Sequence, residues 1–131
     1  MENEIIELHD TKVDRICQNG NNSVVLFSEA YIHRSVGRAG IDPGTVWIRS
    51  ATITFKDGVI TGTLPILPLR ISEGVIQIGN NESSNAISLP LDCAGDVYLS
   101  LQFENGTKVT ISGKSSTLVF TGTEQYLEQF K

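Results

Sequence analysis

The fold class is decided by residues 97–111, which read Val97-Tyr98-Leu99-Ser100-Leu101-Gln102-Phe103-Glu104-Asn105-Gly106-Thr107-Lys108-Val109-Thr110-Ile111. Apolar residues alternate with more polar ones in the first half, which is the period of a strand with one buried face. Asn105-Gly106 tolerates the positive φ angles of a tight turn. This stretch therefore predicts a β-hairpin whose first strand buries Leu99 and Leu101.

Similar strand-like runs recur along the chain between turn residues. Asp57-Gly58 carries the same turn signal and predicts a second hairpin, between strands at 52–56 and 59–61. A further pair of strands is predicted to be joined across residues 19–22. This pair consists of residues 12–18 and 23–33. The remaining predicted strands are residues 67–71, 75–78, 86–89 and 117–121.

Helical periodicity is confined to the C-terminal tail. Tyr126 and Phe130 are four residues apart beside Leu127, and Thr121 and Glu124 have capping-box spacing. The tail therefore predicts one short C-terminal helix over residues 124–130, laid over an open end of the sheet. Together the elements predict a single all-β domain over residues 1–131, an antiparallel sandwich or flattened barrel of about nine or ten short strands.

Composition limits the partners of the chain. Hydrophobic residues make up 40% and charged residues 19% of the 131 residues, which suits one globular core. A net charge of −5 with 10 lysines and arginines argues against nucleic acid and anionic membranes as partners. The chain has neither a bilayer-spanning apolar run nor a recognisable secretion signal. We therefore expect a cytoplasmic protein whose Cys17 and Cys93 are reduced.

The sequence contains no recognisable motif of catalysis or cofactor binding. Nucleophile elbows, zinc-binding helices, paired cysteines and phosphate-binding loops are all missing from it. With His9 and His33 as its two histidines, a three-histidine metal site is excluded. His9 is expected at the surface, Asp10 at a turn before the first strand, and Trp47 in the core. We predict no metal and no cofactor, and the sequence favours a non-catalytic protein.

One segment, from Tyr31 to Gly40, has the composition of a binding loop. It contains His33, Arg34 and Arg38 together with glycines that let a backbone approach a ligand. Arginines donate paired hydrogen bonds to carboxylates and phosphates, and histidine titrates near neutral pH. The segment therefore predicts a site for a small anionic ligand. The alternative is an ordinary surface loop whose arginines pair with acids such as Asp42.

Three functions remain open at this point. The leading hypothesis is a protein-interaction domain, bound to a protein partner or to a second copy through an exposed strand edge. The first alternative is a β-barrel that binds a small anionic ligand through the 31–40 loop. The second alternative is an enzyme of unfamiliar type with His33 as general base. A large apolar surface patch would favour the first, a cavity the second, and a carboxylate beside His33 in a cleft the third.

Overall fold

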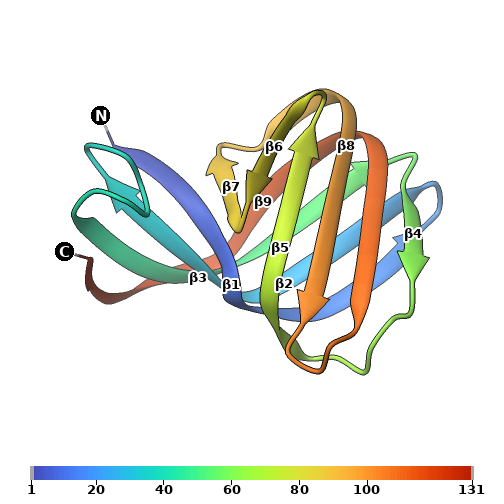
Figure 1. Ribbon diagram of the computed structural model, residues 1–131, viewed down its shortest axis with the longest axis horizontal. Coiled ribbons are helices and arrows are strands. Elements are labelled where there is room, and N and C mark those ends of the chain that lie inside the picture. Colours follow the sequence, from blue (N-terminus) through green and yellow to red (C-terminus); the bar gives the residue numbers. More distant parts are fainter. Residues whose placement is uncertain (1, 131) are drawn as a thin grey trace.

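The computed structural model describes residues 2–130, except for the side chain of Phe130, and folds them into one antiparallel sheet of nine strands (Figure 1). The strands are β1 (Asn3–Asn19), β2 (Asn22–Ser35), β3 (Gly44–Lys56), β4 (Val59–Gly62), β5 (Leu69–Ile78), β6 (Asn81–Ser84), β7 (Ala86–Leu89), β8 (Asp92–Phe103) and β9 (Lys108–Phe130). The predicted all-β fold is confirmed.

The hairpin predicted at residues 97–111 is formed by β8 and β9. Leu99 and Leu101 are fully buried, as the alternation predicts. The turn is one residue longer than Asn105-Gly106 alone, because the N–H of Phe103 donates to the carbonyl of Thr107 at 2.9 Å. Gly106 has a φ of +88°, the left-handed conformation that a three-residue hairpin turn favours.

The sheet closes on itself where β5 meets β1. Neighbouring strands follow the order β6-β5-β8-β9-β3-β2-β1-β7, and β5 also pairs with β1 between residues 69–70 and 12–13. Six strands therefore form a closed ring around the core. Asn85, which separates β6 from β7, completes the junction. Its carbonyl accepts from the N–H of Leu8 at 2.9 Å, and its N–H donates to the carbonyl of Gly74 at 2.7 Å.

Parts of five strands extend beyond this ring and form the left-hand side of Figure 1. They are the first residues of β1 and β3, the last residues of β2 and β9, and β7, in the order β7-β1-β2-β3-β9. Residues 36–43 connect β2 to β3 at the far end of this extension. The candidate site lies here.

The predicted C-terminal helix is wrong, because residues 124–130 continue β9. Tyr126 lies opposite Trp47 of β3, and the two rings meet edge to face with centroids 5.3 Å apart. Residues two or four apart share a face in a strand as well, so the spacing of Tyr126 and Phe130 did not distinguish strand from helix. Pairing with the first half of β3 gives the tail side-chain contacts such as that with Trp47, whereas an isolated short helix is only marginally stable.

The predicted hairpin at Asp57-Gly58 is also wrong, because the chain bends there without reversing. Lys56 pairs with Ser115 of β9 and Val59 pairs with Ser112, so β3 and β4 run along β9 in the same direction. Asp57 has a φ of +50°. The positive φ that Asp-Gly permits therefore makes a corner within a strand path and not a hairpin.

Smaller differences concern the ends of strands. The predicted strands 67–71 and 75–78 merge into β5, and β1 begins well before residue 12. Asp10, expected in a turn before the first strand, has a φ of +72° at an irregularity within β1. His9 is exposed, as predicted. Trp47 is partly buried against the core and both cysteine thiols are free. Within residues 2–130 no helix could cross a membrane.

Candidate functional site

The extension holds a histidine–carboxylate pair in which the histidine is buried and the carboxylate is partly exposed. His33 of β2 lies opposite Ile5 of β1, and Glu7 is two residues further along the same face. The Nε2 atom of His33 is 2.7 Å from Oε2 of Glu7. The His33 side chain is 9% exposed and that of Glu7 is 41% exposed. Glu7 therefore lies between the buried imidazole and solvent.

The hydrogen bond to His33 lowers the pKa of Glu7 below its ordinary value of 4.5. Partial burial opposes this effect, and the electrostatic influence of His33 and of the nearby His9 adds to it. Because the pKa of Glu7 is lowered, its carboxylate is ionised at neutral pH. Glu7 is thus a fixed negative charge at this point of the extension.

This pair forms one wall of a pocket of about 320 Å³. The volume lies near the lower end of the roughly 300–1,000 Å³ of typical ligand pockets. Four aliphatic side chains line it, together with the pair and three further residues: Ile5, Ala39, Ile41, Ala86, Glu7, His33, Gly40, Ser84 and Asn85. The pocket is therefore apolar on several sides and carries an acid on one.

Residues 36–43 fold over this face and form the second wall. Asn3 donates from Nδ2 to the carbonyl of Gly37 at 2.6 Å, and Ser35 donates from Oγ to the carbonyl of Pro43 at 2.8 Å. Gly40 has a φ of +81°, and a β-carbon there would lie 2.7 Å from Cδ1 of Ile5. The positive φ favours glycine at this position, whereas the contact itself is with the end of a flexible side chain that can move aside.

Arg34 points away from His33, because neighbouring residues of a strand face opposite sides. Its guanidinium lies 2.8 Å from carboxylate oxygens of both Glu4 and Glu124 and 4.9 Å from the ring centroid of Trp47. These two acids raise its pKa, the hydrogen bond to Glu124 most. Arg34 therefore joins β1, β2 and β9 on the far face of the extension.

Arg38 is not among the residues that line the pocket. It is 74% exposed and 3.4 Å from Asp42, whose Oδ2 also accepts from the backbone N–H of Arg38 at 2.7 Å. This N–H, followed by the guanidinium, lowers the pKa of Asp42. His33, Arg34 and Arg38, the three residues of the predicted anion site, are thus not brought together. The predicted loop at 31–40 is strand as far as Ser35.

Neither a family model, a curated protein nor a solved structure matches this chain. The site is therefore described by its own geometry.

Glu7 is the site residue that sequence reasoning missed. The signal was present, since Ile6 and Leu8 are both fully buried and alternate with Glu7 and His9. That pattern would have extended the first strand toward residue 3. It could not have shown that Glu7 faces His33, because the register between β1 and β2 includes irregularities around residues 7–15.

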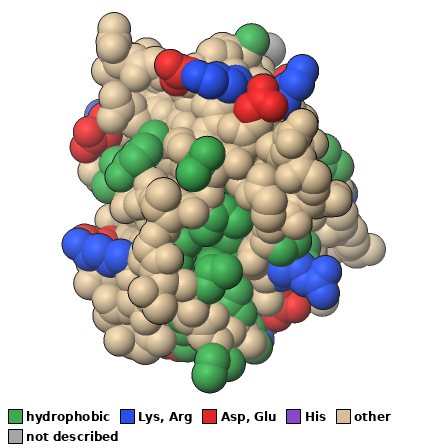
Figure 2. Space-filling view, turned by 90° about the vertical axis from the view of Figure 1, so that its right-hand side faces the viewer, with side chains coloured by type: hydrophobic (Ala, Val, Ile, Leu, Met, Phe, Trp, Pro, Cys, Tyr) green, Lys and Arg blue, Asp and Glu red, His purple; other side chains and the backbone are tan. Residues whose placement is uncertain are grey.

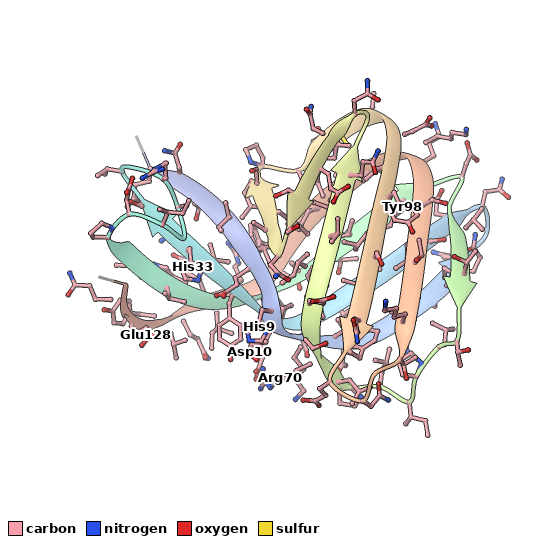
Figure 3. All side chains as sticks on the ribbon, viewed as in Figure 1. His9, Asp10, His33, Arg70, Tyr98 and Glu128 are labelled. Atoms are coloured by element: carbon pink, nitrogen blue, oxygen red, sulfur yellow. The ribbon has the colours of Figure 1, made fainter. Side chains whose placement is uncertain are left out.

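A second group of charged residues surrounds Arg70, near the start of β5 (Figure 3). Arg70 donates to the carbonyl of Asp10 at 2.9 Å and to the carboxylate of Glu29 at 2.8 Å. The ring of His9 donates from Nδ1 to the carbonyl of Ser72 at 2.7 Å, and this hydrogen bond raises the pKa of His9. These bonds tie the irregular part of β1 to β2 and β5. Among residues 2–130, no three histidine, cysteine or acidic side chains could hold a metal ion.

Proposed function

We propose that this protein binds a small ligand in the pocket between β1, β2 and residues 36–43. The observation that carries the proposal is the His33–Glu7 pair, which places a polar group in an otherwise largely aliphatic pocket of about 320 Å³. Apolar walls with few polar groups are the usual composition of a small-molecule site. The ordered bonds of residues 36–43 support a pocket that is formed before the ligand arrives.

The carboxylate beside His33 also meets the condition named above for an enzyme, in which Glu7 would orient His33 as the general base. Glu7 itself is poorly suited to be that base. A general base works best when its pKa is near the working pH, whereas the pKa of Glu7 is lowered. Nε2 of His33 is already hydrogen bonded to this carboxylate. The pair is therefore suited to binding, because the hydrogen bond with His33 holds the charged carboxylate of Glu7 in one position.

The test uses the full chain labelled with ¹⁵N and a panel of small aliphatic amines, alcohols and acids. Saturable shifts of the backbone amides of Ile41, Ser84 and Ala86 are expected with at least one probe, because these residues line the pocket. The variant Ala39→Phe should fill the pocket and abolish the shifts, whereas Ala94→Phe, at an exposed position of β8, should not. Binding that survives Ala39→Phe unchanged would place the ligand elsewhere and contradict the proposal.

A second candidate function, protein–protein interaction, is favoured by an apolar surface at β4. Val59, Leu64 and Ile66 are 55%, 49% and 92% exposed, and residues 59–69 contain no charged side chain. Figure 2 shows hydrophobic side chains in a band along the end of the molecule where β4 lies. An uncharged surface lets two copies, each with a net charge of −5, meet without placing like charges in contact.

The partner that we propose for this surface is a second copy of the chain. Native mass spectrometry and light scattering at increasing concentration should detect a dimer. Ile66→Lys should weaken this dimer, because it buries a charge at the contact, whereas Val36→Lys, at an exposed residue of the distant 36–43 segment, should not. A chain that stays monomeric at high concentration would rule out this candidate.

A further inference from the structure

The charges around the pocket select one class of ligand. Among its lining residues Glu7 is the acid, and no lysine or arginine is present. The two arginines nearest in sequence to His33 have their own partners, Arg34 with two glutamates and Arg38 with Asp42. The chain as a whole carries −5. An anion entering this pocket would therefore meet the Glu7 carboxylate, and the other titratable group of the lining, His33, is already hydrogen bonded to that carboxylate.

The hydrogen-bonding groups of the pocket favour a ligand that donates hydrogen bonds. An ionised carboxylate accepts several hydrogen bonds, and His33 occupies one of its two oxygens. With 41% of the Glu7 side chain exposed, a donor group in the pocket can reach this acid. Ser84, on the β6 side of the pocket, is a further polar residue of the same lining. A charged N–H donor would thus form a short, charge-assisted bond with Glu7.

The rest of the lining suits a short aliphatic body. Ile5, Ala39, Ile41 and Ala86 present hydrocarbon around the acid. Contact with such side chains favours an aliphatic ligand, because it removes apolar surface from water. The volume of about 320 Å³ has room for an aliphatic body of a few carbon atoms.

We propose that the ligand is a small primary amine in its ammonium form, with the cation against Glu7 and a short aliphatic chain between Ile5, Ile41 and Ala86. This inference rests on the proposed function, since it names the ligand class of the same pocket. His33 acts as a positioning residue, because its hydrogen bond holds the carboxylate toward the pocket.

The experiment compares three probes of equal length on the full chain: n-butylammonium, n-butanol and butyrate. Binding is measured by isothermal titration calorimetry and by the ligand-dependent rise in melting temperature. Butylammonium should bind at least tenfold more tightly than butanol, and butyrate should not bind. Equal affinities for butylammonium and butanol would refute the amine while leaving the pocket as a binding site.

Three variants test whether the charge of Glu7, and not a change in the fold, determines the affinity for butylammonium. Glu7→Gln should reduce butylammonium affinity at least tenfold, to the level of butanol. Glu73→Gln removes an exposed acid of β5 and should bind like the unchanged protein. Ile41→Lys places a cation at an exposed position of the pocket lining and should weaken butylammonium without unfolding the chain. If neither Glu7→Gln nor Ile41→Lys weakens butylammonium binding, the inference fails.

Two further outcomes show whether the amine alone or the proposed small-ligand function as a whole is wrong. Absence of binding by all three probes would count against the small-ligand proposal as well as against the amine. Preferential binding of butyrate that is lost in Arg38→Ala would instead support the anionic ligand expected from the 31–40 segment. A melting temperature measured without ligand for each variant shows whether the fold is retained.

Discussion

At the scale of single residues, this protein separates charges that are close in sequence. His33 and Arg34 are neighbours, yet they face opposite sides of the extension and bind different glutamates. Each of these contacts lies across β1 and β2, so the pairing of the two strands sets both. The same strand geometry explains why Glu7 belongs to the pocket and Glu4 to the far face.

The lowered pKa of Glu7 predicts how the stability of the fold depends on pH. A carboxyl whose pKa is lower in the folded than in the unfolded chain stabilises the fold above its unfolded pKa, here about 4.5, and this contribution is lost as the pH falls through the folded pKa. Glu7→Gln should therefore be less stable than the unchanged protein at neutral pH. The gap should close in acid.

Urea titrations at several pH values between about 3 and 7 measure this difference. Glu73→Gln serves as the control, since its side chain is exposed and its stability should follow that of the unchanged protein throughout. A gap for Glu7→Gln that stays constant down to the lowest pH would show that the His33 contact does not depend on the charge of Glu7.

The buried face of β8 predicts a large loss of stability on truncation. Leu101 is fully buried among aliphatic and aromatic neighbours, so Leu101→Ala should cost about 2–5 kcal/mol in the free energy of unfolding. Ser100→Ala, on the other face of the same strand, should change it by less than about 1 kcal/mol. Denaturant unfolding curves give the free energy of unfolding of each variant, provided that the dependence on denaturant concentration is the same for both. A similar loss for the two variants would mean that β8 is one residue out of register.

At the scale of elements, β9 is the strand that joins the two parts of the sheet. Its first half pairs with β8 and β4, and its second half pairs with β3 in the extension. Beyond Leu118 no strand pairs with the outer edge of β9 within the described residues, and Glu128 lies on that edge (Figure 3). Two irregularities in the pairing with β3 bend this half of β9, and bends of this kind blunt a free edge.

The contact between Tyr126 and Trp47 predicts a spectroscopic signature for the C-terminal strand. Trp47 is the single tryptophan of the chain, so tryptophan fluorescence reports on the surroundings of this one ring, of which Tyr126 and the guanidinium of Arg34 are part. Tyr126→Ala should shift the emission of the folded protein and lower stability by about 0.5–1.5 kcal/mol. Leu127→Ala, with a similar exposure, should leave the emission unchanged. An unchanged spectrum in Tyr126→Ala would contradict the pairing of the tail with β3.

At the scale of the whole molecule, one residue completes the ring of strands. Asn85 accepts from Leu8 and donates to Gly74, and its Oδ1 accepts from the N–H of Gly74 at 2.8 Å. It does this with a φ of +58°, a conformation that asparagine tolerates better than most residues. The junction of β1 and β5 therefore depends on a side chain with both an acceptor and this backbone tolerance.

Substitution of Asn85 separates these two requirements. Asn85→Ala should lower the free energy of unfolding by about 2–3 kcal/mol, because it loses the bond to Gly74 and places a β-carbon at positive φ. Asn85→Gly loses the same bond but accepts the backbone conformation, so its cost should be smaller by about 1 kcal/mol. Urea titration of both variants gives the comparison. An equal cost for alanine and glycine would show that the backbone conformation is not a constraint.

The sequence by itself determined the features that depend on near neighbours. Alternation at residues 97–103 and the turn residues after them were enough to predict the hairpin and the burial of Leu99 and Leu101. Each of these depends on side chains a few positions apart, whose faces follow from the period of a strand. The all-β class follows from repetition of the same local pattern.

Tertiary structure alone decided the tail, the corner at Asp57-Gly58 and the pocket. Tyr126 is in a strand because Trp47, far away in sequence, offers a pairing edge, and the local spacing fits a helix equally well. Asp57 permits a positive φ in a corner as readily as in a hairpin, and the partner strand β9 selects the corner. Glu7 meets His33 through the register of β1 on β2. Long-range pairing sets all three, and its energy depends on residues that no local window contains.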